Sequence, residues 1–335
     1  MKLAVIPVTA SCRGHGGSVK VLRKLVPDVE TTEFDLGAKR YNETGDLLPT
    51  PSSTRSVSTT RSCSATIGDP RFVAPGILER GLLLNMRFML DPPREPASGT
   101  QLPAVELAAG REPGIDFVVV REGTEGPYPG NGGSIRIGPR TRSRPRCRST
   151  RGSAPNASSV QRTSWRRRRG HLTLIHQDQR ALNAGRIWTR AMETVGAEYP
   201  DVETAYCHID AATIYMVTDP ARFDVIVTDN LFGDIITDLA GAVTGGIGLA
   251  ASANIDASGT NPSMFEPVHG SAPDIAGQGI ADPTAAILSA AMLLRHLGRE
   301  DDAARIEAAV EADLASRGDG PIVTTEVGDR IAAAV

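Results

Sequence analysis

Apolar runs bounded by polar residues predict the strands of this chain, and apolar residues at helical spacing predict its helices. The clearest strand is Asp224–Asp229, where Val-Ile-Val lies between polar residues, and helical spacing follows from Asn230 to Leu239. The same criteria predict further strands at residues 1–7, 116–120, 172–175 and 202–206. They predict further helices at residues 19–26, 185–196, 283–297 and 300–315.

Other segments show no such periodicity, and they cover Val8–Ser18, Thr50–Ser64, Pro92–Pro113 and Pro139–Arg169. A segment without periodic apolar residues buries little core, so we expect these segments to be irregular. From Asp201 onward we expect well-formed structure. The last irregular segment is rich in arginine and has no acidic residue, so its alternative interpretation is a basic arm that binds nucleic acid.

Composition is that of an ordinary globular protein. The 335 residues suffice for one large α/β body or two lobes. There are 36 basic and 39 acidic residues, a net charge of −3, so no overall field favours nucleic acid or a membrane. We find no signal peptide and no apolar run long enough to cross a bilayer, which predicts a cytosolic protein. Cys12, Cys63, Cys147 and Cys207 lack metal-binding spacing and require no disulfide.

Two aspartates on the predicted helix after Asn230 are the first candidate site. Asp234 and Asp238 are four residues apart, so a helix places them on one face, one turn from each other. Their neighbours Ile235, Ile236 and Leu239 are apolar, which puts the pair at the edge of a buried face. A hard divalent cation is the natural partner of such oxygens, although a solvated surface pair is the alternative.

Two arginine segments and a glycine-rich loop are further candidates. Arg87 lies in the apolar run 81–91 and should have an anionic partner. Arg121 ends a predicted strand and precedes a glycine-rich loop with Tyr128, which suggests an anion clamp with a proton donor. The loop after Glu266 is rich in small residues and lets backbone N–H groups approach a phosphate or an adenosine, although a plain turn is the alternative.

Together these segments resemble the isocitrate/isopropylmalate family of β-decarboxylating dehydrogenases. The resemblance is continuous from Asp201 to the C-terminus and broken before it. It implies an α/β fold of the isopropylmalate dehydrogenase type, with two lobes that share a central sheet. Residues 1–90 plus 240–335 would form the nucleotide-binding lobe, and residues 91–239 the metal, substrate and dimerisation lobe. No G-x-G-x-x-G follows the first strand, so a Rossmann site is not indicated.

The resemblance implies oxidative decarboxylation of 3-isopropylmalate in leucine biosynthesis, with NAD and Mg²⁺ or Mn²⁺ as cofactors. In the family, the leucines before the first arginine, here Leu82–Leu84, contact the isopropyl group. Isocitrate, homoisocitrate and tartrate are the alternative substrates. Asp274 would accept hydrogen bonds from a ribose hydroxyl and repel a 2′-phosphate, which favours NAD over NADP. The family works as a homodimer, in which a lysine and the first metal-binding aspartate come from the second subunit.

The resemblance implies a role for each residue of this chain that stands at a functional position of the family. Arg87, Arg121 and Asp210 would bind substrate, and a further family arginine is replaced by Ala97. Tyr128 would be the acid, and the lysine that acts as base is replaced by Gln177. The metal ligands would be Asp210, Asp234 and Asp238. The cofactor loop would comprise His269, Gly270, Ser271, Ala272, Pro273, Asp274, Ile275, Ala276, Gly277, Gln278, Gly279, Ile280, Ala281 and Asp282.

The departures from the family share one explanation, a slipped reading frame. Codons for the family's Gly-Asp-Gly-Ile give Val8–Ser11 when one base is dropped, and codons for His-Lys-Thr-Asn give His176–Gln179 when one base is added. We therefore prefer a frame-slipped sequence to a chain that truly carries these segments and has lost activity. In either case Gln177 cannot accept a proton near neutral pH, so we expect the chain as printed to be inactive.

Overall fold

The computed structural model describes most of the chain from residue 170 onward and parts of the chain before it. The described residues are 1–6, 12–34, 36–47, 61–64, 73, 77–78, 82, 101–107, 115–123, 170–177, 183–256, 263–270, 272–275, 277–318 and 320–335. The chain divides into two compact units. Unit 1 comprises residues 1–115 and 240–335, and unit 2 comprises residues 116–239.

Unit 1 contains a mixed sheet with the strand order β2-β1-β3-β10-β9-β4. Its strands are β1 (Lys2–Ile6), β2 (Glu30–Glu33), β3 (Arg61–Ser64), β4 (Gln101–Leu107), β9 (Ala250–Asp256) and β10 (Met264–Pro267). β1 pairs in parallel with β2 and β3, and β10 pairs in parallel with β3. β9 runs antiparallel to both β10 and β4. The first strand of the chain therefore lies in the same sheet as strands that follow residue 249.

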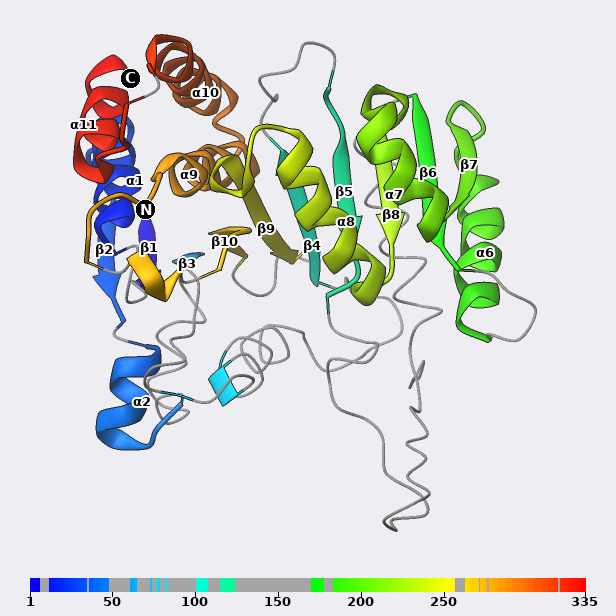
Figure 1. The fold of residues 1–335 in the computed structure, drawn as a ribbon, viewed down its shortest axis with the longest axis horizontal. Coiled ribbons are helices and arrows are strands. Elements are labelled where there is room, and N and C mark those ends of the chain that lie inside the picture. The colour runs from blue at the N-terminus through cyan, green and yellow to red at the C-terminus, as the bar shows by residue number, and fades with distance from the viewer. Residues whose placement is uncertain are drawn as a thin grey trace. The chain divides into compact units, whose positions relative to one another are not determined.

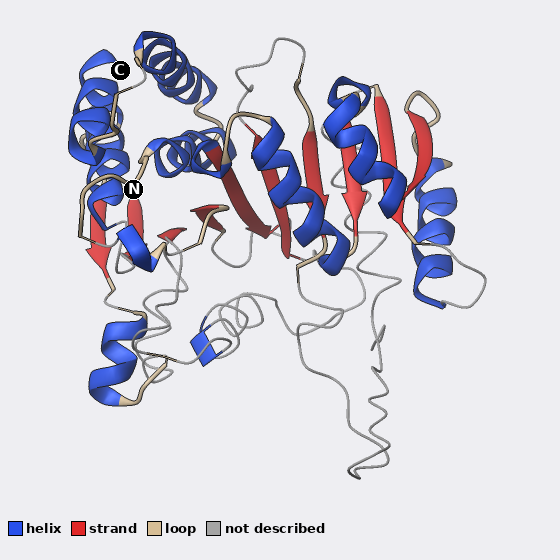
Figure 2. Cartoon of the chain, viewed as in Figure 1, coloured by secondary structure: helices blue, strands red, loops and turns tan. Residues whose placement is uncertain are grey.

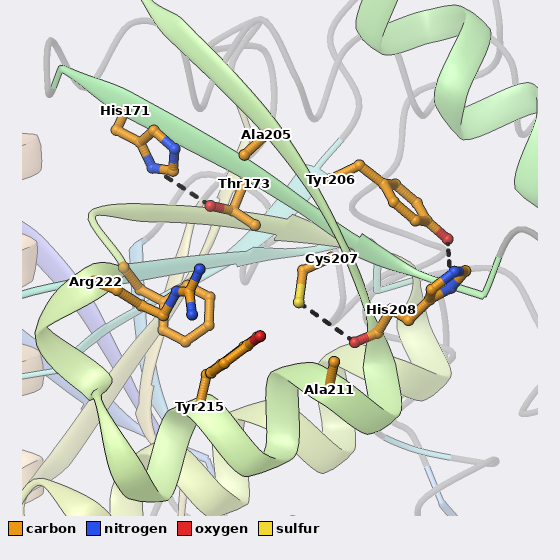
Figure 3. Close-up of a pocket in the computed structure, with 10 residues that line it drawn as sticks. His171, Thr173, Ala205, Tyr206, Cys207, His208, Ala211, Tyr215 and Arg222 are labelled. Carbon is orange, nitrogen blue, oxygen red and sulfur yellow. Dashed lines mark hydrogen bonds between the residues drawn. The ribbon is translucent and has the colours of Figure 1, made fainter.

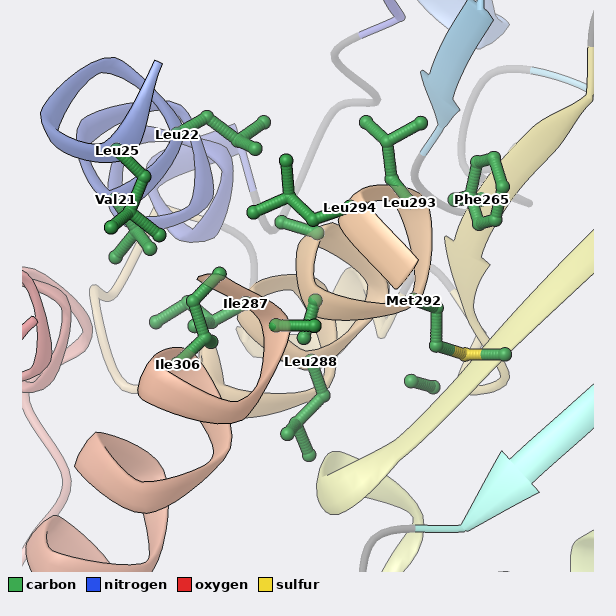
Figure 4. Close-up of a cluster of buried hydrophobic side chains, with 14 of the residues drawn as sticks. Val21, Leu22, Leu25, Phe265, Ile287, Leu288, Met292, Leu293, Leu294 and Ile306 are labelled. Carbon is green, nitrogen blue, oxygen red and sulfur yellow. The ribbon is translucent and has the colours of Figure 1, made fainter. Parts of the chain in front are cut away.

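The helices of unit 1 enclose its apolar core. They are α1 (Cys12–Leu25), α2 (Ala38–Thr44), α9 (Thr284–His296), α10 (Glu300–Ser316) and α11 (Thr324–Ala334), with the short turns η3 (Ile247–Leu249) and η4 (Pro273–Ile275). Every residue of α9 from Thr284 to Leu294 is buried, as expected of a helix that is apolar on all sides. Ile287 and Leu293 of α9 pack in one cluster with residues of α1, α10, α11 and β10 (Figure 4).

Two glycines set the close approach of α1 and α11, which lie side by side in unit 1 (Figure 1). A Cβ on Gly328 would lie 3.0 Å from the Cα of Gly17, and a Cβ on Gly17 would lie 3.2 Å from the Cα of Gly328. Larger residues at either position would force the two helix backbones apart. The C-terminal helix thereby packs directly on the first helix of the chain.

Unit 2 is a parallel α/β layer with the strand order β5-β8-β6-β7 (Figure 2). Its elements are β5 (Val118–Arg121), β6 (His171–His176), α6 (Asn183–Gly196), β7 (Glu203–His208), α7 (Ile209–Thr218), η2 (Pro220–Arg222), β8 (Val225–Thr228) and α8 (Asn230–Val243), whose last turn belongs to unit 1. β8 is buried along its whole length. β6 packs against both α6 and α7. Continuous apolar strands such as Val-Ile-Val are typical of sheets covered in this way.

The strands and helices predicted from the apolar pattern are confirmed; most ends differ by a few residues, whereas α1 begins at Cys12 and not at residue 19. The expectation of irregular structure is wrong in three places. Residues 12–18 lie in α1, residues 61–64 form β3 and residues 101–107 form β4. The two strands form because β1 and β9 supply hydrogen-bonding edges, which a local pattern does not reveal. The rest of those segments lies outside the described residues. Within the described part, no helix is long and apolar enough to span a membrane.

Candidate active site

The carboxyl ends of the parallel strands in unit 2 carry most of the polar residues predicted from the sequence. In the strand register Arg121 is paired with Thr228, and Thr228 with Ile175. β5 therefore ends at Arg121, β8 leads into α8, and β6 leads into Gln177, all at one edge of the sheet. Ligands of open α/β sheets bind outside this edge. The register thus brings the predicted arginine and the helix with the aspartate pair together.

Arg121 is held by the first turns of α8. Its Nε and Nη2 donate hydrogen bonds to Oδ1 of Asn230, at 3.1 Å and 2.7 Å. Its Nη1 forms an ion pair with Oδ1 of Asp234, at 2.7 Å. The side chain of Asp234 is 46% exposed, whereas that of Arg121 is 16% exposed. The guanidinium is therefore fixed from the protein side, next to a carboxylate that reaches solvent.

Gly233 gives Arg121 the space for this position. A Cβ at Gly233 would lie 2.4 Å from Cγ of Arg121, well inside contact distance. Any other residue at position 233 would displace the arginine side chain or the helix. The sequence pattern around the aspartates contains this glycine, but its role becomes visible only when β5 is placed beside α8.

The two aspartates of α8 influence each other as their spacing predicts. Burial raises the pKa of Asp238, the neighbouring charge of Asp234 raises it further, and Arg121 lowers it. Two carboxylates one turn apart, Asp234 about half exposed and Asp238 exposed, provide the oxygen ligands that Mg²⁺ and Mn²⁺ prefer. The donor set of α8 therefore fits a hard divalent cation.

Asp210 is not part of this cluster within one chain. It lies in the first turn of α7, is exposed, and accepts a hydrogen bond from the backbone N–H of Ala211 at 2.8 Å. Among the described residues, no group of three or more His, Cys, Asp or Glu side chains is close enough to hold one metal ion. The structure therefore brings Asp234 and Asp238 together and leaves Asp210 on a different helix.

Gln177 directly follows β6 and is half-buried. Its neighbour His176 is fully buried, stacks on Trp188 of α6 with a ring-centroid distance of 6.2 Å, and meets Phe232 edge-on at 5.3 Å. Nε2 of His176 lies 3.3 Å from Oδ2 of Asp229. His176 thus fixes the end of the strand that presents Gln177. Sequence reasoning did not assign His176 this role, although a histidine at the end of an apolar strand is a usable signal.

The predicted cofactor loop begins after β10, in unit 1. Asp274 lies in η4 and is exposed, so its carboxylate is accessible to a ligand. Nε2 of Gln278 donates to the backbone oxygen of Asp274 at 2.8 Å. Gly277 and Gly279 have φ angles of 80° and 71°, which glycine adopts without strain. These glycines let the chain turn twice between the exposed Asp274 and the start of α9.

Other predicted site residues lie outside the described part of the chain. These are Arg87, Ala97, Tyr128, Ser271 and Ala276. Their roles stay predictions from the sequence.

Unit 2 also contains a cavity that sequence reasoning missed. Its volume is about 410 Å³, and it lies between β6, β7 and α7 (Figure 3). Thr173, Cys207, Tyr215 and Arg222 are among its lining residues, and the guanidinium of Arg222 lies 3.8 Å from the ring centroid of Tyr215. Burial raises the pKa of the Cys207 thiol, while Arg222 opposes this effect. Of the described residues predicted for substrate, metal or cofactor, none is among those that line this cavity.

Comparison with known proteins defines the class to which this fold and site belong. The isocitrate/isopropylmalate dehydrogenase family matches residues 17–331. The solved structure of isocitrate dehydrogenase from Methylococcus capsulatus superimposes with a TM-score of 0.81 at 29% identity, over 99% of this chain and 98% of that one. A β-decarboxylating dehydrogenase from Thermococcus kodakarensis superimposes with a TM-score of 0.76 at 28% identity, over 99% and 95%. The chain therefore belongs to the isocitrate/isopropylmalate dehydrogenase family.

Relatives within the family carry a more specific name. The chain is 66% identical to the 3-isopropylmalate dehydrogenase of Rhodococcus erythropolis over 345 residues, and 55% identical to that of Mycobacterium tuberculosis over 348 residues. Both alignments cover 100% of this chain and of the relative. The predicted family, fold type and dehydrogenase class are confirmed. The individual site residues, the cofactors and the dimer stay predictions.

Proposed function

We propose that this protein is an NAD-dependent dehydrogenase that oxidises and decarboxylates 3-isopropylmalate to 4-methyl-2-oxopentanoate, a step of leucine biosynthesis in the cytosol. The observation that carries the proposal is the full-length identity of 66% to a 3-isopropylmalate dehydrogenase. The cluster of Arg121, Asp234 and Asp238 at the carboxyl edge of unit 2 supports it, because this reaction requires an anion clamp beside hard oxygen ligands.

Arg121 is the group proposed to bind a substrate carboxylate. Asn230 occupies its Nε and Nη2 and fixes the plane of the guanidinium, so the arginine is already oriented before substrate arrives. Such fixed donors lower the entropy lost on binding. The substrate carboxylate would compete with Asp234 for Nη1, and a cation on the aspartates would draw Asp234 away from the arginine.

The proposed metal ligands are Asp234 and Asp238, with Asp210 from a second subunit. A bound Mg²⁺ or Mn²⁺ would polarise the substrate hydroxyl and stabilise the enolate left after loss of CO₂. The proton on that hydroxyl needs an acceptor, and the amide of Gln177 does not supply one near neutral pH. Tyr128 is the proposed acid that protonates the enolate carbon. The chain as printed is therefore proposed to bind substrate but to turn it over poorly.

NAD is proposed to bind along the loop His269–Asp282 of unit 1. The exposed carboxylate of Asp274 would accept hydrogen bonds from the ribose hydroxyls of NAD and would repel the 2′-phosphate of NADP. Bound NAD would accept the hydride from the substrate carbon. The turns at Gly277 and Gly279 would allow the backbone to approach the adenosine closely.

A homodimer is proposed because α7 exposes apolar side chains. Ile214 and Val217 are 61% and 62% exposed and lie three residues apart, on one face of α7. Tyr206 on β7 is 41% exposed and Ile235 on α8 is 46% exposed. α7 packs on β7, and exposed apolar side chains on elements in contact mark an interaction surface. A second copy seated there would bring its Asp210, which begins the same α7, to the shared site.

The test uses a gene in which residues 8–18, 50–64, 92–113, 139–169 and 177–179 are restored to the reading frame of the relatives. NADH formation is measured with 3-isopropylmalate, isocitrate and tartrate at saturating Mn²⁺ and NAD. We expect kcat/KM for 3-isopropylmalate to exceed the other values by about 100-fold, because the apolar Leu82–Leu84 cannot satisfy a further carboxylate or hydroxyl. A higher value with isocitrate or tartrate would overturn the substrate assignment.

A further inference from the structure

A buried network of ion pairs joins the end of the cofactor loop to the C-terminal helices. Arg317, just after α10, lies at its centre: its Nη1 is 2.6 Å from Oδ2 of Asp282, and its Nε is 2.7 Å from Oδ2 of Asp313. Its Nη2 donates to the hydroxyl of Thr284 at 2.8 Å. The side chains of Arg317 and Asp313 are only 9% and 4% exposed. One guanidinium therefore links the loop, the first turn of α9 and the end of α10.

Further contacts hold the carboxylate of Asp282 in a fixed position within unit 1. Its Oδ1 accepts hydrogen bonds from the backbone N–H of Thr284 at 3.0 Å and from the Thr284 hydroxyl at 2.5 Å. Its Oδ2 faces Arg317, and its side chain is 14% exposed. A carboxylate at the start of a helix satisfies N–H groups that lack helical partners. Any effect of Asp282 on a nucleotide through this side chain is therefore indirect, in contrast to the exposed Asp274.

The backbone of the same stretch is tied to α11. The N–H of Thr324 donates to the carbonyl oxygen of Gly279 at 2.8 Å, and its hydroxyl donates to that of Ala281 at 2.5 Å. Thr324 is buried. Arg330 of α11 also joins the network, with its Nε 2.7 Å from Oδ1 of Asp313. Residues 279–282 are thus held from both C-terminal helices, whereas Asp274 and Gln278 stay exposed.

We propose that Arg317 is a positioning residue for dinucleotide binding. It fixes Asp282, and through Asp282 it fixes the turn that carries the exposed face of the cofactor loop. Without the guanidinium, Asp282 would be a partly buried carboxylate without its cation, and the loop would open toward water. A dinucleotide would then have to order the loop when it binds, which weakens its affinity. This inference rests on the proposed role of the loop in NAD binding.

The experiment measures the Kd of NADH for the full chain as printed, by fluorescence energy transfer from protein to cofactor, so no turnover is needed. We expect Arg317→Ala to weaken NADH binding about tenfold, because the cofactor must then order the loop as it binds. Arg317→Lys should restore part of the loss, because it keeps the charge without the fork of donors. Asp282→Asn should also weaken binding, since the amide oxygen can still cap α9 but no longer pairs as a charge with Arg317.

Arg295→Ala is the matched control. Arg295 forms a comparable two-pronged contact with Glu307, at 2.7 Å and 2.8 Å, within the same unit and away from the loop. Its loss should lower the melting temperature and leave the Kd of NADH unchanged. NADH affinity that is unchanged in both Arg317→Ala and Asp282→Asn would overturn the positioning role while the cofactor assignment stands. Absence of NADH binding to the unmodified chain would instead overturn the assignment of the loop, and the inference with it.

Discussion

The two arginine–aspartate clusters of this protein differ in how completely their charges are compensated. In unit 1, Asp313 receives Arg317 on one oxygen and Arg330 on the other, and it is almost fully buried. In unit 2, Arg121 is shared between Asn230 and Asp234, and Asp234 remains about half exposed. The first arrangement resembles a structural clamp, because every charge has a fixed partner.

The second arrangement keeps negative charge close to solvent. Partial burial raises the pKa of Asp238, and the neighbouring charge of Asp234 raises it further, because two carboxylates one helical turn apart repel each other. A divalent cation would relieve this repulsion. We therefore expect similar residue types to serve stability where charges are matched and buried, and to bind a ligand where carboxylates are crowded and accessible.

The largest effect is expected from the aspartates of α8. In the frame-restored enzyme, Asp234→Asn and Asp238→Asn should each weaken Mn²⁺ activation on the order of 100-fold, because each removes a charged oxygen ligand. Turnover is measured while Mn²⁺ is titrated. Asp301→Asn, on the exposed first turn of α10, serves as control and should leave the titration unchanged. Metal dependence that is the same in all variants would show that α8 does not bind the cation.

For the free energy of unfolding, the larger loss should come from the buried cluster of unit 1 and the smaller loss from the aspartates of α8. Asp313→Asn removes a buried carboxylate that Arg317 and Arg330 share, and it should lower the free energy of unfolding by about 3 kcal/mol. Asp234→Asn should lower it by less than about 1 kcal/mol, because its ion pair is partly exposed. Urea unfolding measures both. The exposed pair of Lys20 and Asp329 gives the control, and Asp329→Asn should also cost less than about 1 kcal/mol. Equal losses in all three variants would remove the distinction between the clusters.

Gly233→Ala tests whether Arg121 must occupy its observed position. The new Cβ would lie 2.4 Å from Cγ of Arg121, so we expect a loss of about 1–3 kcal/mol in the free energy of unfolding, with weaker substrate binding. Gly241→Ala in the same helix is the control. Its Cβ would meet its nearest atom at 3.5 Å, so the better helix propensity of alanine should stabilise the protein slightly. If both variants are equally stable, the contact between Gly233 and Arg121 is looser than the structure indicates.

The smallest effect concerns nucleotide choice. Asp274→Ala removes an exposed acceptor and a repulsive charge, so the preference for NAD over NADP should fall about tenfold. The ratio of kcat/KM for the two cofactors in the frame-restored enzyme measures this preference. An unchanged ratio would mean that Asp274 does not face the adenosine ribose.

Much of this architecture could be predicted from the sequence because it depends on local patterns. β1, β5, β6 and β8 coincide with short apolar runs, and α10 with apolar residues at helical spacing. β3 and β4 could not be predicted, because their existence depends on pairing with β1 and β9 from distant parts of the chain. α7 was missed as well, because it is apolar on several faces and lacks the periodicity of an amphipathic helix.

In the candidate site, too, some features follow from local sequence patterns and others depend on contacts between distant residues. The spacing of Asp234 and Asp238 predicted a shared helix face, and the end of an apolar strand predicted the place of Arg121. The contacts of Arg121 with Asn230 and of Arg317 with Asp282 were not predictable. They join residues that are 109 and 35 positions apart, and no local pattern encodes such pairs. The positioning residues were therefore found only from the three-dimensional arrangement.

The proposed function is tested most directly by NADH formation from 3-isopropylmalate, measured for the chain as printed and for the frame-restored chain at saturating NAD and Mn²⁺. We expect clear turnover in the restored chain. We expect turnover lower by at least about 100-fold in the printed chain, because Gln177 cannot act as a base and Ala97 cannot bind a carboxylate. Equal turnover in both would contradict the slipped reading frame, and turnover in neither would contradict the assignment of 3-isopropylmalate as substrate.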